Sequence, residues 1–287
     1  MKRTTNINIP LAILIGDVHL RETQPLCRID DFWEAQWKEL DFIAGLQKKY
    51  NCPVVCAGDL FHHWKPSPYL LAKTIQHLPA QFYTVYGNHD LPQHNLENKN
   101  KSGIYTLQVA GALTVLDEGH WGQDIQTPTL ILQGYRVGVW HIMTWKGQIP
   151  YPGCPDPDAS RILKKYSNYD LLVTGHNHDF FTVEINNRYL INPGSINKQE
   201  AGQIDFNPRI VLWYGDSYAE IPIPGDVNSV TREHIQGKQK RDDRINAFID
   251  HLNQDYEIGV SFEKNLERFF QTNSIRDSVK QVIYDAL

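Results

Sequence analysis

The chain has 287 residues, of which 41% are hydrophobic and 21% charged, and its formal net charge is −5. This is the composition of an ordinary globular protein without a membrane-spanning apolar run, and the acidic balance argues against a histone-like, charge-driven nucleic-acid binder. A basic pair near the start is followed by no apolar segment or cleavage site, so we expect no signal peptide and a cytoplasmic, or nucleoid-associated, protein. The four cysteines fit neither a zinc motif nor a disulfide framework, so we expect them to be reduced.

Strands and helices alternate in the first part of the chain. Short apolar runs at 11–15, 54–57 and 82–86, each cut off by glycine, predict buried strands. Between them, segments 31–49 and 68–78 predict helices, the first from the helical spacing of its apolar residues. This β-α-β-α-β order predicts an α/β sheet with crossover helices on its faces.

After residue 113 the pattern changes to strands with few helices between them. The predicted strands are 113–116, 129–132, 135–140, 171–174, 181–185, 188–191 and 210–214. Asn186 and Asn187 lie between two of these runs and are typical of a tight hairpin turn. We therefore expect a second, more antiparallel sheet that packs on the first.

The remaining segments predict long loops and a helical C-terminal extension. Segments 92–103 and 150–158 are polar or proline-rich loops. Apolar residues recur at helical spacing in 243–252 and 261–270, and a capping box at 274–277 indicates a third helix. We predict a catalytic domain at 1–214, a linker at 215–239, and a helical extension at 240–287 that packs on the core or serves as a docking or dimerising element.

Side chains that bind metals follow five of the predicted strands. In chain order they are Asp17 and His19, then Asp59, then Asn88, His89 and Asp90, then His141, then His176 and His178. Side chains just beyond the carboxyl ends of strands in an α/β sheet face the crevice where ligands bind. Each motif alone is more often structural than functional, but the ordered set of five predicts one site.

The ligand types indicate a pair of divalent cations. Carboxylate, amide and imidazole groups favour Mn²⁺, with Mg²⁺, Fe²⁺ and Zn²⁺ as alternatives, over soft metals. Two cations in one site lie about 3.5–4 Å apart, need a shared anion and activate a water for in-line attack on a phosphate. We expect Asp59, central in the order, to be the shared ligand. We expect His89 to be the catalytic acid and Asp90 to fix the tautomer of His89.

In combination these motifs resemble those of the calcineurin-like metallophosphoesterase superfamily, over about residues 11–214. The resemblance implies a four-layer α-β-β-α sandwich of two mixed sheets. It places Asp17, His19, Asp59 and His178 at one metal, and Asp59, Asn88, His141 and His176 at the other. It implies that His89 is the catalytic acid or contacts the phosphate.

Within the superfamily, the context is similar to the SbcD-like branch of DNA-repair nucleases, in the tracts 59–61, 86–90 and 192–195. Two departures stand out. His62 and His63 replace an acidic residue of many relatives. A solvent-facing or supporting role is the preferred interpretation for them, and a site-lining role with Trp64 and Lys65 is the alternative. Relatives also continue into a larger capping domain and an ATPase-docking segment. Here only 215–287 follows, which leaves an SMC-type ATPase partner or a homodimer as alternatives.

The leading functional interpretation is a metal-dependent exo- or endonuclease that hydrolyses DNA. A phosphodiesterase or phosphatase for small molecules such as cyclic nucleotides is the first alternative, because substrate choice lies in loops. A protein phosphatase and a non-enzymatic metal-binding scaffold are weaker ones. DNA would be held by loop cations and stacking aromatics. The candidates are Lys65, Lys99, Lys101, Lys146 and Arg161, with Trp64, Tyr86 and Trp145. For the aromatics the alternative is core packing, which is the preferred interpretation for Tyr86.

Overall fold

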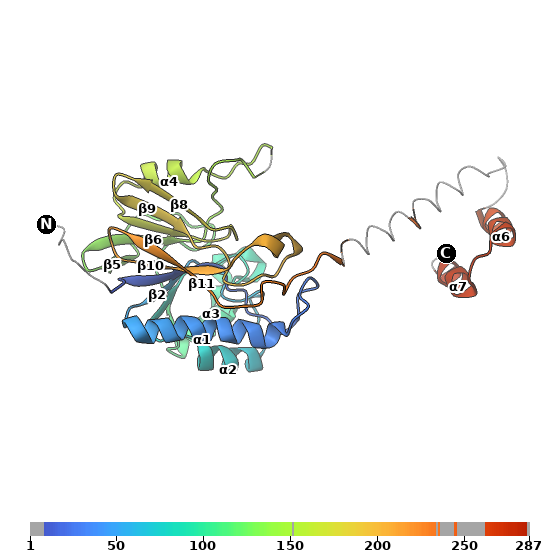
Figure 1. Cartoon of the computed structure of the whole chain (residues 1–287), viewed down its shortest axis with the longest axis horizontal. Coiled ribbons are helices and arrows are strands. Elements are labelled where there is room, and N and C mark those ends of the chain that lie inside the picture. The colour runs from blue at the N-terminus through green and yellow to red at the C-terminus, as the bar shows by residue number, and fades with distance from the viewer. Residues whose placement is uncertain (1–8, 151, 234, 236–243, 246–261, 286–287) are drawn as a thin grey trace. The chain divides into compact units, whose positions relative to one another are not determined.

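The computed structural model describes residues 9–150, 152–233, 235, 244–245 and 262–285 (Figure 1). The chain divides into two compact units, Met1–Thr231 and Arg232–Leu287. None of the described helices combines the length and the apolar character that crossing a membrane requires.

The first sheet has six strands in the order β11-β10-β1-β2-β3-β4. Strands β1 to β4 are parallel, whereas β10 pairs antiparallel with β1, and β11 pairs antiparallel with β10. The strands are β1 (Ala12–Ile15), β2 (Val54–Cys56), β3 (Phe82–Thr84), β4 (Thr114–Val115), β10 (Arg209–Trp213) and β11 (Tyr218–Pro222). The predicted opening of the fold is confirmed, and its sheet is mixed.

The second sheet has five strands in the order β5-β6-β7-β9-β8, and it is also mixed, because β6, β7 and β9 run parallel. The strands are β5 (Leu130–Leu132), β6 (Tyr135–Trp140), β7 (Leu171–Thr174), β8 (Phe181–Ile185) and β9 (Arg188–Asn192). Asn186 and Asn187 join β8 to β9 with φ angles of 53° and 56°. Two successive positive φ angles define the type I′ hairpin turn that this dipeptide predicts.

Helices cover the outer face of each sheet. The helices are α1 (Phe32–Tyr50), α2 (Pro68–His77), α3 (Gly103–Val109) and α4 (Ala159–Lys165), with short 3-10 turns at Pro92–His94, Leu96–Lys101 and Ala201–Asp205. Helix α1 begins because the Asp31 side chain accepts a hydrogen bond from the amide of Glu34, and it ends at Asn51 in a left-handed conformation. Helix α2 begins with a Ser67 cap followed by proline.

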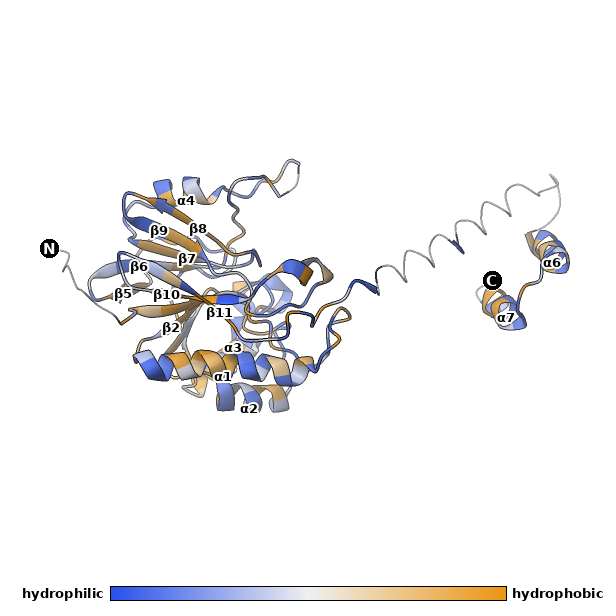
Figure 2. Ribbon diagram, in the orientation of Figure 1, coloured by the Kyte–Doolittle hydropathy of each residue, from blue (hydrophilic) through white to orange (hydrophobic). Residues whose placement is uncertain are grey.

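Alternation along the strands separates three apolar layers. In β1, Ile13 and Ile15 pack with the helices α1, α2 and α3, whereas Ala12 and Leu14 pack with residues of the second sheet. On the far face of the second sheet, Leu172 packs with residues of α4. Figures 1 and 2 show the resulting order, helices, sheet, sheet, helix, with apolar residues along the strands of both sheets. The predicted four-layer α-β-β-α sandwich is confirmed.

The structure corrects the predicted linker at 215–239. Strand β11 lies inside this segment and pairs along its length with β10. The residues of β11 are partly buried or exposed, as in an edge strand. The sequence prediction missed this strand because it relied on continuous buried apolar runs. The sheet therefore extends to Pro222.

The second unit contains two described helices, α6 (Phe262–Thr272) and α7 (Asp277–Asp285). Leu266 and Phe270 of α6 are buried, and the Phe270 ring lies 5.6 Å from that of Tyr284 in α7. Helix α7 begins at Asp277, the last residue of the predicted capping box at 274–277, so the helix begins later than a cap at Ser274 predicts. The helix predicted at 243–252 falls almost entirely outside the described residues.

Candidate metal centre

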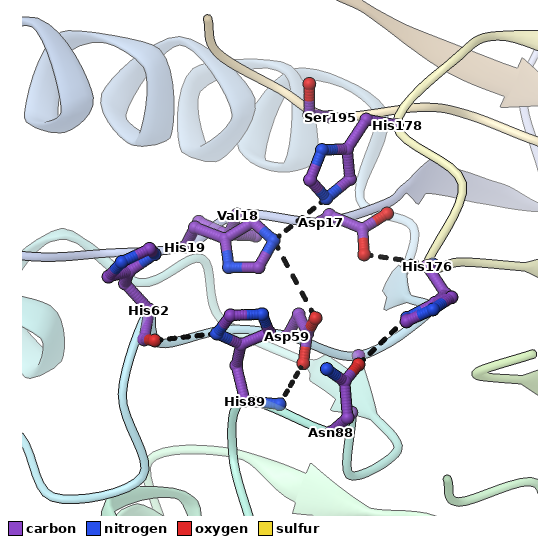
Figure 3. A network of polar contacts seen from close by, with 12 residues as sticks. Asp17, Val18, His19, Asp59, His62, Asn88, His89, His176, His178 and Ser195 are labelled. Carbon is purple, nitrogen blue, oxygen red and sulfur yellow. Dashed lines mark hydrogen bonds and ion pairs between the residues drawn. The ribbon is translucent and has the colours of Figure 1, made fainter. Parts of the chain in front are cut away.

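The five predicted strand-end motifs meet at one point of the sandwich. The loops after β1, β2 and β3 of the first sheet face the loops after β6 and β7 of the second, as the close-up in Figure 3 shows in part. The side chains there include two groups of ligand atoms, and within each group the atoms lie no more than 4.8 Å apart. One group is Asp17, His19 and His178, and the other is Asp59, His141 and His176.

Close backbone approach makes glycine necessary in these motifs. A Cβ on Gly87 would lie 2.0 Å from Asp59 Oδ1, and one on Gly58 would lie 2.6 Å from His141 Nδ1. Three of the converging residues adopt left-handed backbone conformations, with φ of 51° at His19, 51° at Asp59 and 73° at His176. Such conformations cost free energy in residues with a Cβ and concentrate at functional sites.

The first group combines one carboxylate with two imidazoles. Asp17 is fully buried, and its Oδ1 accepts a hydrogen bond from the amide of His176 at 3.0 Å. Its Oδ2 has no partner. The Nε2 atoms of His19 and His178 point at one another 3.1 Å apart. Two nitrogens each about 2.0–2.1 Å from a common ion, at right angles, lie about 3 Å apart, so this pair can share one cation.

The second group is built around Asp59, which is fully buried. Its Oδ1 accepts a hydrogen bond from the amide of His89, whereas its Oδ2 has no hydrogen-bond partner. That oxygen lies 3.4 Å from His141 Nε2 and 3.7 Å from His19 Nε2, so it is close to both groups. Asn88 Oδ1 lies 3.0 Å from His141 Nε2 and 2.9 Å from His176 Nδ1.

Hydrogen bonds fix the orientation of the imidazole of His141. His141 Nδ1 donates to the carbonyl oxygen of Ala57 at 2.7 Å, which leaves Nε2 directed at Asp59 and Asn88. A backbone carbonyl that holds the far nitrogen of a histidine is the usual support of a metal ligand. The first sheet therefore orients a ligand contributed by the second.

The electrostatics of the centre depend on burial and on close opposite charges. Burial opposes ionisation of Asp59, but the imidazoles of His141 and His19 outweigh it and hold the pKa of Asp59 below its usual range. For His141, burial is again outweighed, here by Asp59, and the pKa rises to about 9. Burial lowers the pKa of His176 to about 4 and that of His19 well below its ordinary value. Neutral imidazole is the form that binds metals, so the lowered pKa values of His19 and His176 favour binding, whereas His141 would release a proton when a cation binds.

His89 and Asp90 have different surroundings from those predicted. His89 Nδ1 donates to the carbonyl oxygen of His62 at 2.8 Å. Both carboxyl oxygens of the buried Asp90 accept backbone amides, at 3.0 Å from Phe61 and at 3.0 Å from Gly87. The prediction that Asp90 fixes the tautomer of His89 is therefore wrong. Asp90 instead ties the loop after β2 to the loop after β3.

Sequence reasoning underestimated two residues of the centre. His62 lies with His19 and His89 in a further group of ligand atoms within 4.8 Å, which the adjacent Asp59 motif could have suggested. The ring of Trp121 lies 4.6 Å from that of His176. No sequence motif near Trp121 predicts this contact. Tyr86 is 1% exposed and packs in the core, as the preferred interpretation of this residue expects.

The donor set fits divalent cations. Carboxylate and carboxamide oxygens and imidazole nitrogens surround the centre, and the buried oxygens Asp17 Oδ2 and Asp59 Oδ2 lack partners. An unpaired buried carboxylate oxygen is costly unless an ion or proton satisfies it. The seven residues predicted as ligands therefore form a centre able to hold two cations, and the binding itself stays a prediction.

Fold and site together define a class of protein: a two-sheet sandwich that directs carboxylates and imidazoles from five strand ends to one point. The family model of the calcineurin-like phosphoesterase superfamily domain matches residues 11–207, and the chain belongs to this superfamily. Members of the superfamily are hydrolases that act on phosphoesters and use divalent metals. No curated protein sequence matches the chain.

Several solved structures are similar to this chain at low sequence identity. A novel archaeal phosphodiesterase is 15% identical with a TM-score of 0.42, over 74% of this chain and 98% of that one. A Staphylococcus aureus protein assigned as a 5′-nucleotidase is 14% identical with a TM-score of 0.47, and the match covers 80% of this chain but 57% of that one. Vacuolar protein sorting 29 from Cryptosporidium parvum is 17% identical with a TM-score of 0.37, over 74% and 96%.

Proposed function

We propose that the protein is a phosphodiesterase that hydrolyses DNA with two divalent cations, of which Mn²⁺ is the preferred one. The observation that carries the proposal is the position of Asp59. Its unpaired Oδ2 lies within 3.7 Å of imidazole nitrogens from both ligand groups. An anion that faces imidazoles from both ligand groups is the shared ligand that a two-cation site needs.

In this proposal the seven ligands divide between two cations. Asp17, His19 and His178 hold one, while Asn88, His141 and His176 hold the other, and Asp59 belongs to both. Bound cations supply Lewis acidity to a phosphate oxygen and lower the pKa of a water molecule. The Ala57 carbonyl keeps His141 in the tautomer that can ligate.

His89 acts on the leaving group. Its Nδ1–H donates to the His62 carbonyl, so the other ring nitrogen is free to hold a proton. Its ring lies 4.8 Å from that of His19, at the edge of the first ligand group. We assign His89 as the acid that protonates the leaving oxygen, or as a donor to the phosphate.

Two features support DNA as the substrate. The tracts around Asp59 and Asn88 are similar to those of the SbcD-like repair nucleases. The loops that follow these tracts and His141 carry the exposed side chains of Lys99, Lys101 and Lys146, which could accompany a phosphate backbone.

The test is hydrolysis by the full-length protein with Mn²⁺. End-labelled single- and double-stranded DNA, bis-nitrophenyl phosphate and cyclic nucleotides are compared at matched concentration, each with and without excess chelator. We expect DNA cleavage that chelator abolishes and that Mn²⁺ restores. Undiminished hydrolysis in chelator would refute the metal requirement. Much faster turnover of cyclic nucleotides than of any DNA would replace the nuclease with a small-molecule phosphodiesterase.

A further inference from the structure

A second feature of the surface adjoins the metal centre. A groove of about 620 Å³ is lined by the loop after β6, the loop after β7 and the segment 205–209. Asn177, which lines it, lies between the ligands His176 and His178 in the chain, and its side chain donates to the carbonyl oxygen of Thr144 at 2.8 Å. The groove therefore borders the loop after β7, which carries these two ligands of the metal centre.

Four aromatic side chains line this groove and remain partly exposed: Trp145, Phe180, Phe181 and Phe206. Two of them are held in place. Trp145 Nε1 donates to the carbonyl oxygen of Asp156 at 2.9 Å, and the guanidinium of Arg209 lies 4.7 Å from the centre of the Phe180 ring. Aromatic surface that stays exposed in one concave patch marks a place where a ligand binds.

The charges of the groove cancel. Lys146 and Arg209 line it, but so do Asp179 and Asp205. Recognition of duplex DNA relies on an excess of Lys and Arg against the phosphates, which this lining lacks. Aromatic rings, by contrast, stack on base faces, and only unpaired bases present those faces. The lining thus suits bases more than backbone.

We propose that this groove binds unpaired bases of the DNA strand that is cut at the metal centre. The inference rests on the proposed nuclease function and adds to it a preference for a single-stranded segment next to the cleaved bond. Phe180 and Phe206 stack on bases, while Lys146 follows the adjacent phosphate. In this proposal the phosphodiester bond is hydrolysed at the metal centre, and the groove positions the strand.

The first experiment measures binding without cleavage. Fluorescence anisotropy of a labelled oligothymidylate and of a duplex of equal length is recorded with the full-length protein in chelator. We expect tighter binding of the single strand. Phe206→Ala should weaken it by at least about fivefold, since a stacked base contributes about 1–3 kcal/mol. Phe206→Leu, which keeps the apolar volume but loses the ring, should weaken it as well.

Two further variants separate stacking from general damage. Tyr69→Ala removes an aromatic ring that is 57% exposed on α2, outside the groove, and should leave binding unchanged. Lys146→Ala removes one cation from the groove and should reduce the slope of log affinity against log salt by about 0.7. Because Lys146 is exposed, its removal does not endanger the fold.

The second experiment distinguishes the two proposals. With Mn²⁺, Phe206→Ala should slow cleavage of single-stranded DNA while hydrolysis of bis-nitrophenyl phosphate stays at the wild-type rate. If the wild type cleaves DNA but neither Phe206→Ala nor Lys146→Ala changes binding or cleavage of the single strand, the groove proposal is wrong and the nuclease stands. If the wild type hydrolyses bis-nitrophenyl phosphate but no DNA, the nuclease proposal fails, and the groove proposal fails with it.

Discussion

Two buried polar clusters of the same compact unit contain carboxyl groups with an unpaired oxygen, but the surroundings of these carboxyl groups differ. At the metal centre, Asp17 Oδ2 and Asp59 Oδ2 are buried without a hydrogen-bond partner. In a second cluster, which consists of Arg28, Glu39 and Lys198 beside a cavity of about 710 Å³, Glu39 Oε2 is also buried without a partner. Burial and an unpaired oxygen alone therefore do not identify a metal site.

The difference lies in the groups that surround each carboxyl. Arg28 is already satisfied by Asp30, at 2.6 and 2.7 Å, and by the carbonyl oxygen of Lys198. The Lys198 ammonium donates to the carbonyl oxygens of Ile204 and Val227. Glu39 then needs only a proton, and burial raises its pKa to about 8.

At the metal centre, a proton on one oxygen cannot satisfy the neighbouring imidazoles. His19 Nδ1 has no partner, and the Nε2 atoms of His19 and His178 face one another. Several donors with free lone pairs converge, so a cation satisfies all of them at once. A buried carboxylate marks a metal site when several imidazole nitrogens and a second carboxylate converge with it.

The largest effect should come from Asp59→Asn, because it removes the anion close to both ligand groups. We expect loss of bound Mn²⁺ and a loss of turnover greater than that of any other variant described here. Metal content after Mn²⁺ loading and desalting, with the rate on bis-nitrophenyl phosphate, measures both. The matched control is Asp41→Asn, whose carboxyl pairs with His77 away from the centre. Two Mn²⁺ ions retained in Asp59→Asn would contradict its role as the shared ligand.

His89→Ala should separate chemistry from metal binding. We expect both cations to stay bound while turnover falls about 10²- to 10⁴-fold, the usual contribution of a positioned acid. His77→Ala, on helix α2, is the control and should keep full activity. If His89→Ala loses metal as Asp59→Asn does, His89 is a ligand and not the acid.

Glu39→Gln should change how stability depends on pH. Folding raises the pKa of Glu39 from 4.5 to about 8, so the folded state keeps a proton that the unfolded state releases. The free energy of unfolding therefore falls as pH rises from about 4.5 to about 8, by up to about 1.4 kcal/mol per pH unit. The glutamine variant lacks this slope.

Denaturant titrations between pH 5 and 9 test this prediction on both proteins. The variant should match the wild type at the acidic end and exceed its stability at the alkaline end, with Mn²⁺-dependent hydrolysis unchanged. Parallel stability curves across the whole range would show that Glu39 does not titrate between these limits.

The smallest effect should be that of Asp90→Asn. Replacing one carboxyl oxygen with an amide leaves a buried backbone amide without an acceptor, which costs about 1–3 kcal/mol of stability. Metal content should stay at the wild-type level, and turnover should fall far less than in His89→Ala. A thermal melt and the phosphodiester assay decide this. An unchanged melting temperature with activity as low as in His89→Ala would restore the tautomer role for Asp90.

Local pattern sufficed to predict that these side chains converge, because each of them lies within a few residues of the end of a buried strand. The apolar run before Asp59 forms β2, and the run before Asn88 contains β3, so the carboxyl ends of parallel strands bring these side chains together. Asn186 and Asn187 likewise predicted their hairpin, since positive φ angles are cheap for asparagine. In these places the information is contained within a few consecutive residues.

Only the tertiary structure decided the partners of residues far apart in the chain. Asp90 lies beside His89 in the sequence, yet its carboxylate accepts a hydrogen bond from an amide of another loop. The His62 carbonyl, and not Asp90, accepts the hydrogen bond from His89 Nδ1. The contact of Trp121 with His176 and the groove shared by Trp145 and Phe206 also join separate loops. Sequence by itself determined the strands, the ligand types and their order. Packing decided which polar groups support the centre, because hydrogen bonds between loops depend on how whole sheets pack and not on neighbours in the chain.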